Sequence, residues 1–240
     1  MVDPDGSYCT GTLISPTVFL TAAHCAPRTT GDAVTFATHY DPASSMVYSI
    51  CRGPEACIDD NQDGYPDNFD GRYKADPNGY DIAAVKFNEP VKDESGSLIT
   101  PARLPSLHRF DRVAKNQKFT AVGYGEQGAT STVYDTRTYA VSTFKSVSED
   151  YLRLSQNVNQ DNGGTCYGDS GGPNFFGAAV TGDETDVIAG ITNTGDPWCK
   201  ATNVTLRLDN EAARTFLSSK FFEGQGVTLP PGPPQGPAVP

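Results

Sequence analysis

The segment GGTCYGDSGGP, from Gly163 to Pro173, contains one serine, Ser170, among five glycines, an aspartate and a cysteine. Glycines close to the serine allow a substrate carbonyl group to come near the backbone. A serine hydroxyl is a poor nucleophile at neutral pH, so it needs a base to take its proton and a group to orient that base. Histidine and aspartate are the residue types for these two roles.

Two other short segments supply candidates for both roles. His24 follows an apolar segment in TAAHC, and Asp81 begins DIAAVKF, where the residues after the carboxylate are mostly apolar. A lone histidine or a lone loop aspartate is more often structural than catalytic. Neither segment is therefore decisive by itself.

The composition limits the class of protein. The chain has 240 residues, enough for a sizeable core in one or two domains, and a net charge of -11 that speaks against nucleic acid or an anionic membrane surface as partner. No apolar segment is long enough to span a bilayer. Six cysteines without a CxxC pair or zinc-like spacing predict three disulfides and an oxidising, extracellular location.

Short alternating segments bounded by Gly, Pro, Asn and Asp predict strands along most of the chain. They cover residues 11–23, 33–40, 46–52, 81–87, 118–125, 136–147, 151–155 and 186–194. Asp209 can cap one helix, whose apolar stripe consists of Ala213, Phe216, Leu217 and Phe221. Many short strands without intervening helices indicate an all-β barrel or sandwich.

The motifs together resemble the chymotrypsin/trypsin family of serine proteases, and within it a secreted, bacterial-type member. TGTLIS, LTAAHC, DIAAV and GDSGGP follow the family order His, Asp, Ser, and the resemblance covers about residues 7 to 222. It implies an all-β fold of two antiparallel, six-stranded-type barrels with a C-terminal helix. It also implies catalysis without a cofactor, by His24 as general base, Asp81 as its orienting carboxylate and Ser170 as nucleophile. The N–H groups of Gly168 and Ser170 would form the oxyanion hole.

The resemblance also divides the chain. We expect an N-terminal barrel over residues 1–103 with an acidic insertion at 51–71, and a C-terminal barrel with the helix over residues 104–222. The Pro/Gly-rich residues 223–240 are predicted to be a disordered tail. By resemblance, Cys9 pairs with Cys25 and Cys166 with Cys199, which leaves Cys51 with Cys57.

The family pattern further places the substrate pocket. Its expected residues are Gly164, Thr165, Asn193, Thr194 and Gly195. An aspartate at the Gly164 position would select Arg or Lys, so the glycine predicts a neutral side chain, small or hydrophobic, at the cleavage site. Asn193 can hydrogen-bond to Asp81, and an extended peptide can pair with the backbone of residues 193–195.

A second motif, DDNQDGYPDNFD, lies between the histidine and the aspartate. It matches the calcium loop D-x-N-x-D-G-x5-E except at its last residue, where an aspartate replaces the glutamate. The predicted calcium ligands are Asp59, Asn61, Asp63, Tyr65, Asp67 and Asp70. Its flanks do not resemble EF-hand helices, so this would be a helix-free calcium loop inserted in a barrel. The ion would stiffen the insertion and would not take part in the chemistry. The alternative is a solvated acidic loop.

One part of the family pattern is missing. Family members become active when a new N-terminal ammonium pairs with the aspartate before the nucleophile, here Asp169. Only eight residues precede Cys9, without an IVGG-like start, so the first strand is expected to be missing. Three explanations stay open: an N-terminally truncated chain, a subfamily that orders its oxyanion hole in another way, or a zymogen-like chain.

Two functions follow from the sequence. The first is a secreted, monomeric serine endopeptidase that cleaves protein or peptide substrates through an acyl-enzyme intermediate. A protein inhibitor is a possible partner of such an enzyme. The second is a non-catalytic or zymogen-like binding module on the same fold, stabilised by calcium. All three triad residue types are present, which favours the enzyme.

Overall fold

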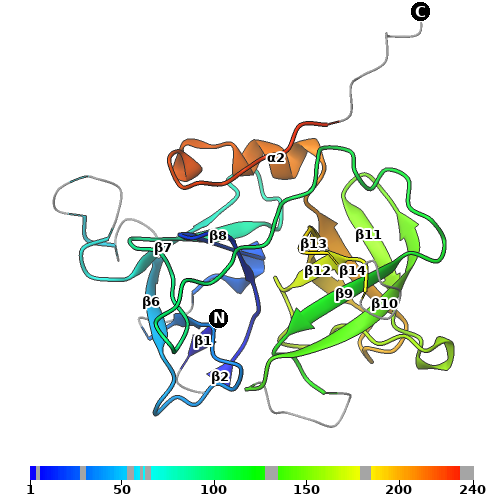
Figure 1. Ribbon diagram of the computed structural model, residues 1–240, viewed down its shortest axis with the longest axis horizontal. Coiled ribbons are helices and arrows are strands. Elements are labelled where there is room, and N and C mark those ends of the chain that lie inside the picture. Colours follow the sequence, from blue (N-terminus) through cyan, green and yellow to red (C-terminus); the bar gives the residue numbers. More distant parts are fainter. Residues whose placement is uncertain are drawn as a thin grey trace, which may run out of the picture.

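The computed structural model describes residues 1–3, 6–27, 31–52, 57–59, 62, 66–127, 135–178 and 185–232. Two β-rich halves lie side by side, and one α-helix lies across the top of the view in Figure 1. Among the described residues, no helix has both the length and the apolar character to cross a membrane. The predicted fold class is confirmed: the protein is mostly β, with two barrel-like sheets and a helix near the C-terminus.

The first half is an eight-stranded sheet in the order β2-β1-β5-β6-β7-β8-β4-β3. Neighbouring strands are antiparallel except for β6 and β7, which are parallel. Its strands are β1 (Val2–Asp3), β2 (Gly6–Ser7), β3 (Thr12–Ser15), β4 (Val18–Thr21), β5 (Ala33–Thr35), β6 (Val47–Arg52), β7 (Gly71–Ala75) and β8 (Ala83–Phe87). Contrary to expectation, the residues before Cys9 form strands, a short hairpin that pairs with β5.

The second half is a closed antiparallel barrel in the order β10-β11-β14-β13-β12-β9. Its strands are β9 (Lys118–Gly123), β10 (Thr138–Val147), β11 (Tyr151–Ser155), β12 (Pro173–Phe176), β13 (Ile188–Gly195) and β14 (Thr202–Arg207). Short 3-10 helices are η1 (Ala23–Cys25), η2 (Val158–Gln160) and η4 (Lys220–Phe222). The predicted disulfides Cys9–Cys25, Cys51–Cys57 and Cys166–Cys199 are all present.

One apolar cluster joins the two halves to the helix α2 (Glu211–Leu217). Leu20 of β4 and Ile191 of β13 are fully buried in it, together with Phe216 of the helix. Burial of such side chains contributes about 1.5 to 3 kcal/mol each. The halves are therefore held against each other by a shared core as well as by chain connectivity.

The N-cap of the helix lies one residue later than predicted. Asn210, and not Asp209, is the N-cap, because its side-chain oxygen accepts a hydrogen bond from the Ala213 amide (3.0 Å). The Asp209 carboxylate is fully buried and bound to the Arg207 guanidinium and the Phe110 amide, so it is not free to cap. The predicted apolar stripe is confirmed for Ala213, Phe216 and Leu217, which are buried in α2. Phe221 is not part of it, because the helix ends at Leu217 and Phe221 lies partly buried in η4.

The segment after the helix differs from the expected disordered tail. Val227 and Leu229 pack against the shared core, and the Thr17 hydroxyl donates to the Gln225 side chain (3.0 Å). Residues 223–232 therefore lie against the folded body. Residues 233–240 lie outside the described part of the chain.

Candidate active site

The pairing of β4 with β8 brings the candidate base to its carboxylate. Thr21, at the end of β4, pairs with Ala83 at the start of β8, which places η1 beside Asp81, two residues before β8. Asp81 accepts hydrogen bonds from the His24 backbone amide (2.9 Å) and from the His24 ring nitrogen Nδ1 (2.8 Å). With Nδ1 donating to the carboxylate, Nε2 is left as the acceptor nitrogen of the ring.

The Asp81 carboxylate has a third partner. The Asn193 side-chain amide donates to the same oxygen that faces the histidine ring, a contact anticipated from the sequence. Burial alone raises the pKa of Asp81, but the hydrogen bonds from His24 outweigh it and hold the pKa below its usual value. The carboxylate is therefore ionised at neutral pH and can stabilise a protonated imidazole.

Glycine lets the serine turn approach the histidine loop closely. Gly171 has φ +79°, and a Cβ on it would lie 2.6 Å from the Ala22 amide nitrogen and the Thr10 carbonyl oxygen. Any side chain there would push the turn away from the end of β4. The Ser170 carbonyl also accepts a hydrogen bond from the Thr10 amide (2.8 Å), which fixes the turn to the first half.

Ser170 and His24 line one pocket of about 310 Å³. The residues around it are His24, Thr165, Cys166, Tyr167, Ser170, Thr192, Asn193, Thr194, Gly195, Asp196, Pro197 and Cys199. No hydrogen bond joins the serine hydroxyl to the histidine ring, a contact that is commonly loose before substrate binds. The amides of Gly168 and Ser170 donate to no other described residue, so both N–H groups are available to a ligand.

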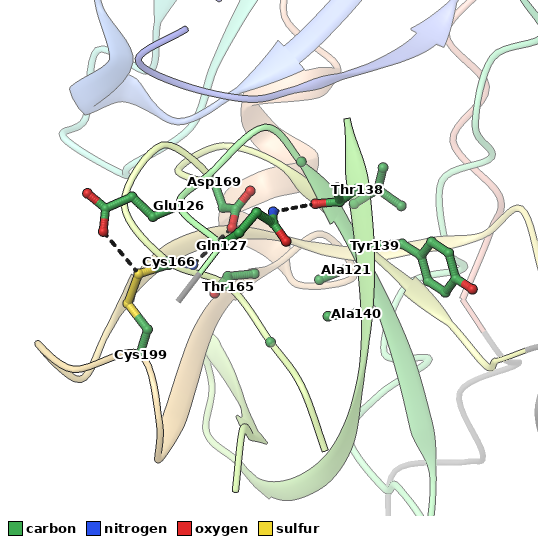
Figure 2. A pocket seen from close by; sticks show the side chains of 13 residues that line it. Ala121, Glu126, Gln127, Thr138, Tyr139, Ala140, Thr165, Cys166, Asp169 and Cys199 are labelled. Atoms are coloured by element: carbon green, nitrogen blue, oxygen red, sulfur yellow. Dashed lines mark hydrogen bonds between the residues drawn. A yellow bond between two sulfur atoms is a disulfide. The ribbon is translucent and has the colours of Figure 1, made fainter. Parts of the chain in front are cut away.

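Asp169 lies on the other side of the same turn, at a second cavity of about 150 Å³ shown in Figure 2. Its carboxylate accepts hydrogen bonds from the amides of Gly125 and Cys166, both at 2.9 Å. Burial raises the pKa of Asp169 to about 6 against the effect of these bonds. No described cationic group lies within 4.0 Å of it. The Met1 amino group instead donates to the Cys9 carbonyl oxygen (2.7 Å).

Gln156, which no sequence motif indicates, is buried against Gly164 and Thr165 of the predicted substrate pocket. This residue directly follows β11 and is 1% exposed, and its side-chain oxygen accepts a hydrogen bond from the Thr165 amide. A Cβ on Gly164 would overlap the Gln156 side chain. Gly164 itself lines the cavity of Figure 2, whereas Thr165 lines both cavities. No motif surrounds Gln156, so only the fold reveals its position.

The predicted calcium loop is only partly described. Asn61, Asp63 and Tyr65 lie outside the described residues. The carboxylate of Asp59 is 3.7 Å from the Arg72 guanidinium, and one oxygen of Asp70 accepts from the amide (2.7 Å) and hydroxyl (2.8 Å) of Ser49. Asp67 contacts Ile58 through its backbone amide. The first and last loop positions thus have protein partners that an ion would have to share or displace.

A second group of metal-ligand residue types does not fit a metal. Ligand-type atoms of Cys9, His24 and Cys25 lie within 4.8 Å of one another. The two sulfurs form a disulfide, so they cannot bind a metal as thiolates.

The Trypsin family model matches residues 2–207. The chain belongs to this family. Glucanase inhibitor protein 4 from Phytophthora infestans is 26% identical over 213 residues, which are 82% of this chain and 73% of that protein. An atomic-resolution structure of HBP has a TM-score of 0.64 at 17% identity, covering 97% of this chain and 91% of the other. Human heparin binding protein gives 0.63 at 17% identity, covering 97% and 92%. The structural likeness shows the fold alone.

The raised pKa of Asp169 predicts a pH dependence of stability. The folded protein holds a proton on this carboxyl up to about pH 6, whereas the unfolded chain releases it near pH 3.8. The free energy of unfolding therefore falls as pH rises through this window, by on the order of 2 to 3 kcal/mol from this group. Urea unfolding measures the free energy of unfolding of wild type and of Asp169→Asn at several pH values between 4 and 7. As pH rises through this range, the wild type should lose about that amount of stability relative to the variant. If the difference in the free energy of unfolding between the two proteins does not change with pH, the pKa of Asp169 is not raised.

Proposed function

We propose that the protein is an extracellular serine endopeptidase. The arrangement that carries the proposal is the ionised Asp81 bound to His24 and Asn193, with the histidine sharing a pocket with Ser170. An orienting carboxylate and a histidine beside a glycine-flanked serine are the parts needed to activate a hydroxyl nucleophile. The three disulfides suit an oxidising compartment.

The proposed reaction has two steps. The Ser170 oxygen attacks the carbonyl carbon of the scissile bond while His24 Nε2 takes the hydroxyl proton, and the amides of Gly168 and Ser170 hold the developing oxyanion. The imidazolium, stabilised by Asp81, then gives its proton to the leaving amine, and an acyl-enzyme remains. Water attacks the ester in the same way and releases the acid. No metal or cofactor takes part in these steps.

The pocket supports a small, neutral residue on the amino side of the scissile bond. Thr165 lines the pocket, and the buried Gln156, whose side-chain oxygen accepts from the Thr165 amide, would limit the depth available to a longer side chain. Residues 193–195 form the end of β13, where the backbone of an extended peptide can pair as an added strand. Under the proposal the substrate is a protein or peptide, and the enzyme acts as a monomer. A protein inhibitor can compete with the substrate for the same surface.

A non-catalytic binding module is the second candidate. The curated relative is named for inhibition of a glucanase and the structural neighbours for heparin binding, so membership of the family does not bring catalysis with it. Asp169 also lacks a described cationic partner, as a zymogen-like chain would. Under this candidate the serine pocket would bind a partner without cleaving it.

Labelling with a fluorophosphonate probe separates the two candidates. Under the proposal, the wild-type protein is labelled and Ser170→Ala is not. Asp81→Asn should reduce peptide turnover roughly ten-thousandfold, because the histidine then adopts the wrong tautomer. Asp161→Asn, which changes an exposed carboxylate, is the control and should keep full activity. Absence of labelling in the wild type, including an N-terminally extended form, would favour the binding module.

The depth of the pocket should depend on Gln156. Gln156→Ala removes the side chain behind Thr165, so cleavage after Leu or Phe should rise about tenfold or more relative to cleavage after Ala. Gln156→Leu keeps most of the volume and should keep the wild-type preference. A peptide library scored by kcat/KM measures both variants, with Gln160→Ala as an exposed control. An unchanged preference in Gln156→Ala would mean that other residues set the depth.

A structural calcium ion is proposed for the acidic loop at residues 59–70, on the spacing of its carboxylates. If the ion binds, excess calcium should raise the melting temperature by several degrees over EDTA, since a ligand of the folded state stabilises it. Asp63→Asn should abolish the response and Asp161→Asn should not. Equal melting temperatures in calcium and EDTA would favour a solvated acidic loop.

A further inference from the structure

A wide groove crosses the outer surface of the closed barrel, apart from the serine pocket. It has a volume of about 870 Å³ and is lined by residues of β10, of the end of β11, of the segment around η2 and of the segment before β14. These elements belong to the closed barrel, at the right of Figure 1. Its lining residues are Lys115, Thr143, Phe144, Lys145, Ser155, Asn157, Gln160, Asn162, Lys200 and Ala201. Volumes of about 300 to 1,000 Å³ are typical of ligand sites.

The groove concentrates positive charge on an acidic protein. The chain carries 29 acidic against 18 basic residues, yet the groove is lined by three lysines and by no acidic residue. Lys118 lies next to the groove, because it contacts the lining residues Thr143 and Asn162. Together with the three lining lysines it makes up half of the lysines of the chain. Like charges in a concave surface raise the local potential and favour an anion.

Neutral groups hold two of these ammonium groups in place. Lys118 donates to the Thr143 hydroxyl (2.7 Å) and to the Asn162 side-chain oxygen (3.1 Å). Lys145 donates to the Thr202 hydroxyl (2.7 Å). An ammonium has three donors, so each lysine keeps at least one for a ligand. The side chains are oriented without being neutralised.

The nearest carboxylates along the chain do not line the groove. Asp161 is exposed and directly follows η2. Asp196 accepts hydrogen bonds from the backbone amides of Lys200, Ala201 and Thr202, at 2.7 to 3.1 Å. No described carboxylate lies within 4.0 Å of the ammonium groups of the groove lysines. The charges of the three lining lysines therefore remain available to an external anion, and Lys118, bound to Thr143 and Asn162, adds to the local positive potential.

We propose that this groove binds a linear acidic polysaccharide. The lysines would pair with its carboxylate or sulfate groups, and the amides of Asn157, Gln160 and Asn162 with its hydroxyl groups. Only Phe144 and Ala201 are apolar in the lining, which disfavours a lipid surface. Phe144 is the only aromatic residue of the lining and packs against the core cluster around Phe110 and Phe119, so the lining offers no free ring on which nucleic-acid bases could stack. Cys199 lines the serine pocket and Lys200 lines the groove, so the two sites are neighbours on one segment.

Binding to defined polymers tests the groove without reference to catalysis. Polygalacturonate supplies carboxylates, dextran sulfate supplies sulfates, and neutral dextran supplies neither. At low salt at least one acidic polymer should bind and neutral dextran should not, and added salt should weaken binding. The acidic polymer that binds more tightly identifies the anionic group. Poly-glutamate of matched length tests for an acidic peptide as the ligand.

Charge-reversal variants locate the site. Lys145→Glu and Lys200→Glu, both at exposed positions, should each weaken binding at least about fivefold. Lys220→Glu makes the same charge change near α2 and should stay within about twofold of wild type. Melting curves confirm that each variant is folded. The proposal is overturned if neither acidic polymer binds, if poly-glutamate binds as tightly, or if Lys220→Glu weakens binding as much as the groove variants.

Discussion

The contact of the serine turn with Thr10 and with the end of β4 is the constraint on which the site depends. Thr10 donates from its amide to the Ser170 carbonyl (2.8 Å) and from its hydroxyl to the Gly168 carbonyl (2.9 Å). Gly171 provides the positive φ and the lack of a side chain that such a close approach needs. Nucleophile and base come from different sheets, so their distance is set by this packing and by the shared core beneath α2.

The chemistry of the site was readable from the sequence because each part lies in a short motif. His24, Asp81 and Ser170 are marked by their neighbours, and the Asn193 contact to Asp81 followed from its place in the family pattern. The resemblance also gave the disulfide pairing. Among the strands of the two sheets, the alternating pattern identified several, including β10 and β13, but it missed β7, β12 and β14, which pair with strands distant in sequence or are not marked by alternation.

What the sequence could not give depends on three-dimensional contacts. Gln156 is an ordinary polar residue in the chain, and its hydrogen bond with the Thr165 amide arises only because the fold brings the end of β11 against this segment. Asp209 is a good capping residue by type, but its buried bond to Arg207 leaves the cap to Asn210. The groove lysines are likewise scattered from Lys115 to Lys200, and only barrel closure gathers them.

The path of the chain after α2 has a practical consequence for handling the protein. Because Val227 and Leu229 cover part of the core that joins the two halves, the folded unit extends well past the helix. A recombinant fragment that stops at residue 222 would leave an apolar surface open at the seam between the sheets, where exposed patches promote association. A purification tag or fusion partner is better attached after residue 232 than directly behind the helix.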